Sequence, residues 1–137
     1  MPNAAIVGSD PDHRMLLRGL LHLEHHQVVA EAEGREVLER LDAPGGTDLL
    51  VVTEDAAGGR WQELVTDARR GRPALKVVLI TARRTDPLVK AASSAGIDSV
   101  LQRPFALRQF AEAVVPSPTR SGAYATGPAR PTSDEER

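Results

Sequence analysis

The chain has 137 residues, of which 41% are hydrophobic, 26% charged and 3% aromatic, with a formal net charge of −2. This length and composition support one domain with a buried core, while the weak negative charge and scarce aromatic residues argue against nucleic-acid binding. The absence of cysteines excludes disulfides and thiolate metal sites, and the apolar runs are too short to cross a bilayer, so we expect a cytoplasmic protein without membrane contact.

Apolar runs alternate with amphipathic segments along most of the chain. In chain order the pattern predicts a strand at 4–7, a helix at 10–26, a strand at 27–32, a helix at 34–41, a strand at 49–52, a helix at 61–70, a strand at 77–80, a helix at 86–95, a strand at 99–101 and a helix at 106–115. Five strand and helix pairs in succession favour parallel βαβ units, with helices on both faces of one sheet.

The first helix has a clear start. Asp10 is expected as its N-cap and Pro11 as its first residue. Its apolar positions suit a 3.6-residue stripe and are Met15, Leu16, Leu20, Leu21 and Leu23. We therefore expect this stripe to face the core.

The composition changes at Pro116. Residues 116–137 are rich in Pro, Ser, Thr and Gly, a composition that cannot bury enough apolar surface to order itself. The expected organisation is a domain at 1–115 followed by a disordered tail at 116–137.

Four segments, taken in order, resemble the receiver domain of two-component response regulators: VGSDPDHRMLLRGLLHLEHHQVVAEAEGREVLERL, TDLLVVTEDAAGG, KVVLITAR and AGIDSVLQRPF. The resemblance spans roughly residues 4–115. It implies a flavodoxin-like α/β fold, doubly wound, with five helices around a five-stranded parallel sheet of order 2-1-3-4-5 and a site at the carboxyl ends of the strands.

In that family an aspartate that closes the third strand takes a phosphoryl group from a phosphohistidine in a phosphorelay. Two acids after the first strand help to hold magnesium, a lysine after the fifth strand pairs with the phosphate, and a serine or threonine closing the fourth strand responds to it. The matching positions here are Gly8 and Ser9 for the acids, Thr53 for the phosphoacceptor, Thr81 for the responding hydroxyl and Arg103 for the lysine.

These replacements remove the chemistry of phosphoryl transfer. The hydroxyl of Thr53 is unactivated and cannot form an acyl phosphate, and Gly8 and Ser9 offer no carboxylate to a metal. Val100 replaces the aromatic residue usual in the fifth strand, while Thr81, Pro104 and Phe105 keep the family's residue types. We therefore expect an aspartate-less, stand-alone receiver that works independently of phosphorylation.

Three acids lie near the expected site. Asp10 is better explained as a helix cap than as a metal ligand. Glu54 and Asp55 could occupy the vacant site, and Glu54 could imitate a phosphorylated aspartate, although a shift of one residue along a strand turns a side chain to the opposite face.

Other chemistry has little support. The four histidines His13, His22, His25 and His26 lie on or at the end of one helix. His22 and His26 have the i, i+4 spacing of a metal pair, but no third ligand is in view, so solvent-facing histidines near the end of the helix are expected. No histidine is placed to activate a hydroxyl nucleophile. We expect no enzyme, no cofactor and no bound metal.

The leading hypothesis is a signalling module that binds an unidentified signalling protein, with a homodimer left open. By the resemblance, its interaction face lies on the fourth helix, fifth strand and fifth helix and includes Val89, Ala92, Ser93, Val100, Gln109 and Glu112. The alternative is a small-molecule or anion sensor that uses the vacated pocket beside Arg103. A DNA-binding regulator is disfavoured because no helix-turn-helix pattern follows Val115.

Overall fold

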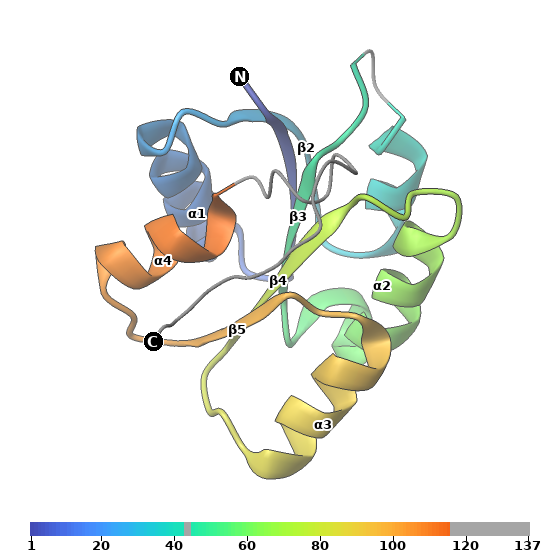
Figure 1. The fold of residues 1–137 in the computed structure, drawn as a ribbon, viewed down its shortest axis with the longest axis vertical. Helices are drawn as coiled ribbons and strands as arrows, with labels where there is room; N and C mark the ends of the chain where they lie inside the picture. The colour runs from blue at the N-terminus through green and yellow to red at the C-terminus, as the bar shows by residue number, and fades with distance from the viewer. Residues whose placement is uncertain (43–44, 116–137) are drawn as a thin grey trace, which may run out of the picture.

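The structure, a computed structural model, describes residues 1–42 and 45–115. Figure 1 shows a central sheet flanked by helices. The strands are β1 (Asn3–Val7), β2 (Gln27–Ala32), β3 (Leu49–Thr53), β4 (Lys76–Thr81) and β5 (Ser99–Gln102). The α-helices are α1 (Pro11–Leu23), α2 (Trp61–Arg69), α3 (Asp86–Ala95) and α4 (Leu107–Val114), and two 3-10 helices are η1 (Arg35–Arg40) and η2 (Ala56–Gly59). The predicted tail at 116–137 lies outside the described residues.

The five strands form one parallel sheet with the order β2-β1-β3-β4-β5, which confirms the predicted order. Val7 pairs with Val52, Thr53 with Ile80 and Thr81 with Gln102. Because all strands run the same way, their carboxyl ends lie along one edge of the sheet. The residues that follow β1, β3, β4 and β5 are thereby brought to a single region.

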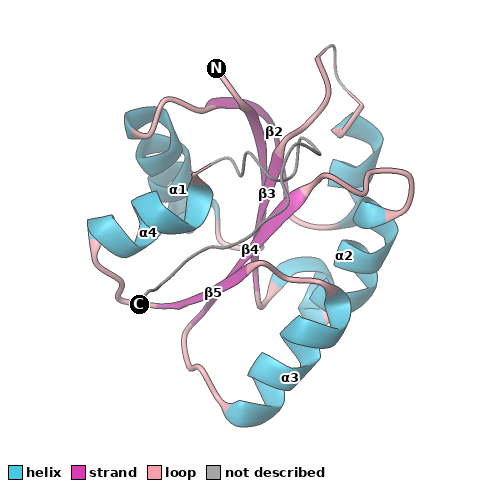
Figure 2. Ribbon diagram, viewed as in Figure 1, coloured by secondary structure: helices cyan, strands magenta, loops and turns pink. Residues whose placement is uncertain are grey.

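Two hydrophobic cores lie on opposite faces of the sheet. Along β3, Leu49 and Val51 belong to the core under α1 and α4, whereas Leu50 and Val52 belong to the core under α2 and α3. The helices cover the two faces in this division (Figure 2). Successive strand residues point to opposite faces, so a sheet covered on both sides needs an unbroken apolar strand, which β3 provides.

The segment predicted as the second helix is shorter and tighter than expected. Residues 35–40 form the 3-10 helix η1, and within it only Val37 is buried. Six residues are too few for α-helical hydrogen bonding to become cooperative, and short 3-10 turns are usual as connectors. The element is therefore a connecting turn that contributes one side chain to the core.

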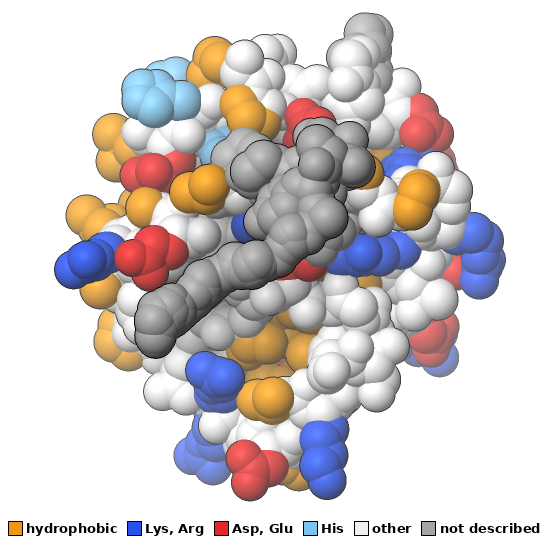
Figure 3. Space-filling model, viewed as in Figure 1, with side chains coloured by type: hydrophobic (Ala, Val, Ile, Leu, Met, Phe, Trp, Pro, Cys, Tyr) orange, Lys and Arg blue, Asp and Glu red, His pale blue; other side chains and the backbone are white. Residues whose placement is uncertain are grey.

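The prediction for the buried face of α1 was right for Leu21, which is buried, and for Leu20, which packs against the core, but wrong for the other three positions. His13, Leu17 and Leu21 are its buried residues, whereas Met15 and Leu16 are 57% and 56% exposed. Leu23 is also exposed. Leucines occupy so many positions of this helix that composition alone does not fix its rotation against the sheet. Apolar side chains are consequently visible on the surface over α1 (Figure 3).

None of the helices in the described ranges has the length and hydropathy needed to span a bilayer.

Candidate functional site

The strand-end site, as we call Gly8, Ser9, Thr53, Glu54, Asp55, Thr81 and Arg103, lies at the carboxyl edge of the sheet. Thr53 is the last residue of β3 and Thr81 the last residue of β4. Since β1, β3 and β4 are adjacent, the sheet brings five of these residues into two hydrogen-bonded groups, Ser9–Asp55–Thr53 and Glu54–Thr81, and places Gly8 against Thr53.

The first contact joins the loop after β1 to the end of β3. A Cβ atom placed on Gly8 would lie 2.6 Å from Oγ1 and 3.0 Å from Cγ2 of Thr53. Thr53 is 2% exposed, so its side chain has little room to move away. Position 8 therefore has no space for a carboxylate while threonine occupies position 53.

Asp55 links these same two segments. Its Oδ1 accepts a hydrogen bond from the Thr53 hydroxyl and a longer one, at 3.5 Å, from the backbone N–H of Ser9. Burial raises the pKa of Asp55, but the hydrogen bonds from Thr53 and Ser9 and the charge of Arg103 outweigh it, so the pKa lies below its usual range. A carboxylate with a lowered pKa is a weak general base, and it therefore activates the Thr53 hydroxyl poorly.

Glu54 contacts the end of the neighbouring strand. Its Oε1 accepts a hydrogen bond from the hydroxyl of Thr81, whose side chain is fully buried, and the backbone N–H of Arg83 donates to the same hydroxyl at 3.1 Å. The expectation from strand alternation, that Glu54 points away, was wrong. β3 ends at Thr53, so the alternation of side chains along the strand no longer governs residue 54.

Arg103 stands apart from both groups. Its side chain is exposed, and among the described residues its guanidinium forms no ion pair within 4.0 Å. It borders a depression of about 200 Å³ whose other lining residues are Glu54, Asp55 and Ala82. Its charge acts on the site at longer range by lowering the pKa of Asp55.

Asp10 has the role that its sequence predicts. It is the N-cap of α1 and accepts a hydrogen bond from the backbone N–H of Asp12 at 2.9 Å. This contact leaves Asp10 as part of the helix start, consistent with the prediction of a cap.

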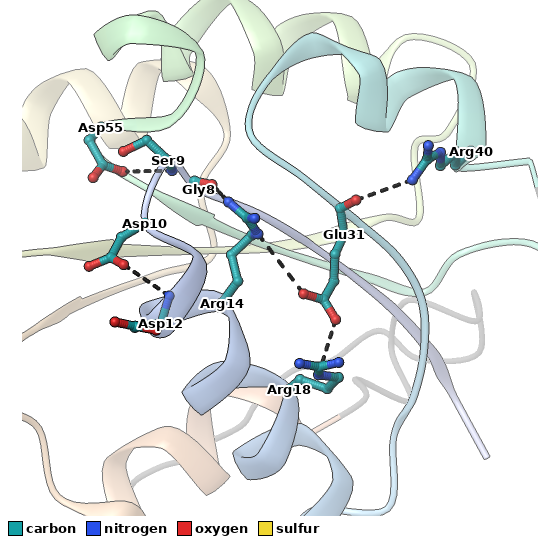
Figure 4. A network of polar contacts seen from close by, with 9 residues as sticks. All are labelled: Gly8, Ser9, Asp10, Asp12, Arg14, Arg18, Glu31, Arg40 and Asp55. Atoms are coloured by element: carbon teal, nitrogen blue, oxygen red, sulfur yellow. Dashed lines mark hydrogen bonds and ion pairs between the residues drawn. The ribbon is translucent and has the colours of Figure 1, made fainter.

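Sequence reasoning did not identify Arg14, which fixes the loop after β1. Its Nη1 donates to the carbonyl of Gly8 at 2.5 Å, and its Nε lies 4.0 Å from Glu31, which also pairs with Arg18 at 3.1 Å (Figure 4). An arginine on a helix gives no sequence signal for a bond to a carbonyl six residues earlier in the chain. The network ties Gly8 to α1 and β2 and so helps to hold it against Thr53.

The expectation of solvent-facing histidines was wrong for two of the four. His13 is 8% exposed and His26 is 2% exposed. α1 ends at Leu23, and the backbone turns at His25, with φ of 63°, so that His26 folds back beneath the helix end. His22 and His26 are therefore not one turn apart on a helix. No group of three metal-binding side chains of the types His, Cys, Asp or Glu occurs within residues 1–42 and 45–115.

A second region lies at the edge of the sheet that β5 forms. Val89, Ala92, Ser93, Val100, Gln109 and Glu112, which we call the α3–β5–α4 face, all line one depression of about 490 Å³. Figure 3 shows apolar side chains between β5 and α3 in this area. Arg69 of α2 supports the same area: its Nη2 lies 2.7 Å from Asp98 Oδ2, and Asp98 is another lining residue.

Solved structures share this fold. A response regulator receiver domain protein from Methanospirillum hungatei JF-1 is 20% identical with a TM-score of 0.72, over 83% of this chain and 90% of that chain. A response regulator from Thermotoga maritima is 21% identical with a TM-score of 0.72, over 83% and 94%. A putative pilus assembly-related protein from Burkholderia pseudomallei K96243 is 21% identical with a TM-score of 0.72, over 83% and 87%.

No curated protein sequence matches the chain. Residues 4–115 match the model of the response regulator receiver domain, and the sheet order and the position of the site agree with that match. The chain therefore belongs to the family of response regulator receiver domains.

Proposed function

We propose that this receiver domain signals without phosphoryl transfer, by binding another signalling protein through the α3–β5–α4 face. The observation that carries the proposal is the pairing of both strand-end hydroxyls with acids of the same chain. Thr53 donates to Asp55 and Thr81 donates to Glu54. Both hydroxyls of the site already donate to carboxylates of the same chain, so neither is free to interact with an incoming phosphoryl group.

Two features oppose phosphoryl transfer at this site. Thr53 offers an alcohol whose hydrogen-bond acceptor, Asp55, has a lowered pKa and is a weak base. Gly8 cannot be replaced by a metal-binding acid without striking Thr53.

The pairing of Thr81 with Glu54 supports a fixed rather than a switching state. The carbonyl of Thr81 accepts the backbone N–H of Arg103 at 2.8 Å, so the end of β4 and the segment after β5 are joined. β5 in turn contributes Val100 to the α3–β5–α4 face. A permanent bond at Thr81 biases this connected unit toward one conformation, which a partner would then recognise.

An anion sensor in the vacated pocket has less support. Two of the four residues that line the depression at Arg103 are acids, Glu54 and Asp55. Their charge repels an anion that enters this depression, where both acids lie at close range. We therefore place the function of the domain on its outer face, with a cytoplasmic signalling protein or a second copy of this chain as the partner.

Phosphoryl transfer is tested by intact-mass analysis of the full chain after incubation with acetyl phosphate and magnesium. We expect no gain of a phosphoryl group on the folded protein, and a stable gain would overturn the proposal. The variant Thr53→Asp is the informative comparison. It supplies a carboxylate but no metal-binding acids at Gly8 and Ser9, so we expect at most a small labelled fraction.

The binding face is tested with two neighbouring serines on α3. Ser93 lines the depression and Ser94, which is also exposed, does not. A partner captured by crosslinking should be lost with Ser93→Arg and retained with Ser94→Arg. For a second copy as partner, sedimentation of the purified chain should show the same difference. Equal effects of the two substitutions would place the contact elsewhere.

A further inference from the structure

A second groove lies beside Arg103, and neither Glu54 nor Asp55 lines it. It has a volume of about 480 Å³ and is lined by His13, Leu16, Leu20, Arg103, Pro104, Phe105 and Leu107. We propose that this groove binds a small organic anion, with an alkyl or aryl body against α1 and a carboxylate at Arg103. The proposal does not depend on the function proposed above.

Apolar side chains form the walls of the groove and remain open to water. Leu16 is 56% exposed and Leu107 is 66% exposed, although they come from separate helices, α1 and α4. Phe105 is held between these helices by stacking on Phe110, with ring centroids 5.7 Å apart. Apolar surface of this kind gains free energy when a ligand removes it from water, at about 25 cal/mol per Å².

Arg103 supplies the polar end of the groove. Its guanidinium is exposed and, within the described ranges, has no ion-pair partner. A guanidinium binds a carboxylate through two parallel hydrogen bonds, which a neutral head group cannot reproduce. The free arginine thus selects for an anion where the walls select only for an apolar body.

His13 adds a second polar group at the same end. It lines the groove, is 8% exposed, and its buried Nε2 has no hydrogen-bond partner among the described residues. Burial and the charge of Arg103 lower its pKa against the opposing effect of Asp10 and Asp55, which favours the neutral ring. A neutral imidazole can donate to or accept from a ligand head group without repelling the positive end of the groove.

The test measures the binding of three probes to the full chain by ¹H–¹⁵N NMR titration. Octanoate has both the anionic head and the apolar body, octanamide keeps the body with a neutral head, and acetate keeps the head alone. We expect saturable shifts with octanoate at Leu16, Leu107 and the ring signals of His13. Octanamide and acetate should each bind about tenfold more weakly or worse.

Substitutions separate the two contributions. Arg103→Gln should weaken octanoate about tenfold and leave octanamide unchanged, whereas Leu16→Ala should weaken both. Arg84→Gln is the matched control, because Arg84 is an exposed arginine that does not line this groove. Equal affinity for octanoate and octanamide, an equal loss with Arg84→Gln, or shifts confined to other surfaces would overturn the proposal, as would an absence of saturation.

Discussion

The strand-end site and the α3–β5–α4 face differ in how their polar groups are satisfied. At the strand-end site, Thr53 and Thr81 are buried and both donate to carboxylates two or more residues away in the same chain. On the face, Ser93, Gln109 and Glu112 are exposed around a depression. Buried groups that satisfy one another leave an incoming ligand little to gain, whereas exposed groups around a hollow are available to a partner. The place where the family performs its chemistry thus has fewer polar groups available to a ligand than the face has.

Removal of the arginine that supports the face should have the largest effect on stability. In Arg69→Ala, Asp98 loses an ion pair with N···O of 2.7 Å, and the carbonyl of Gly96 loses a donor at 2.6 Å. We expect a loss of about 2–3 kcal/mol in the free energy of unfolding, because both contacts are partly shielded from water. Urea denaturation measures the loss.

Arg70→Ala is the matched control for this prediction. Arg70 pairs with Asp67 at 3.3 Å, but its side chain is 75% exposed. Exposed pairs contribute about 0–1 kcal/mol, so Arg70→Ala should be clearly milder. Equal losses in the two variants would show that the face does not depend on the contact with Asp98.

Insertion of a methyl group at the strand-end site should cause the second-largest loss of stability. Gly8→Ala places a carbon 2.6 Å from Thr53 Oγ1, and the strain should cost about 1–3 kcal/mol. Gly19→Ala, on α1, is the control: no atom lies within 4 Å of the added carbon, so it should be neutral or stabilising. Thermal denaturation distinguishes the two.

A double variant sharpens the assignment of that strain. Thr53→Ala removes Oγ1 and Cγ2, the two atoms that a side chain at Gly8 would strike first. The combined Gly8→Ala and Thr53→Ala variant should therefore be more stable than the sum of the single losses predicts. Strict additivity would mean that the Gly8 and Thr53 contact is not the source of the strain.

Loss of the Thr53 hydroxyl should have a smaller effect that depends on pH. The pKa of Asp55 is lowered in the folded protein, so its carboxylate adds stability above the unfolded pKa of about 4. This stability is lost as the pH falls through the lowered folded pKa. Thr53→Val should cost about 1 kcal/mol at pH 7 and flatten the acid limb of stability against pH. An unchanged acid limb would exclude Asp55 as the titrating group.

Arg103→Ala should have the smallest effect. The side chain is exposed and forms no ion pair within the part of the chain that the structure describes. We therefore expect a change of about 1 kcal/mol or less, far below that of Arg69→Ala. A larger loss in chemical denaturation would reveal a structural contact at Arg103.

The periodicity of apolar residues and the positions where the apolar runs end were enough to predict the strands of the parallel sheet. The apolar runs that became β3 and β4 have β-branched residues at most positions, and their ends mark Thr53 and Thr81 as neighbours at one edge. The cap at Asp10 was also predictable, because Pro11 follows it. These features depend on local sequence.

The directions in which side chains point were not predictable. Leucines occur on several sides of helix α1, so packing against the sheet, rather than composition, decides that His13, Leu17 and Leu21 are buried. Glu54 turns toward Thr81 because β3 stops one residue earlier. Strand length is settled by pairing with β4, and a single residue of length reverses the expected direction of a side chain.

The contact between Gly8 and Thr53 also limits the order in which the family's acids could be introduced at these two positions. An acid introduced first at position 8 meets the Thr53 hydroxyl at 2.6 Å and lowers stability before any metal can bind. A change at Thr53 must come first, and that change alone lacks the metal ligands and so confers little activity. The order of mutations is constrained, and each single step is neutral or harmful. This is sign epistasis, in which the contact between two residues fixes the order in which both can be changed.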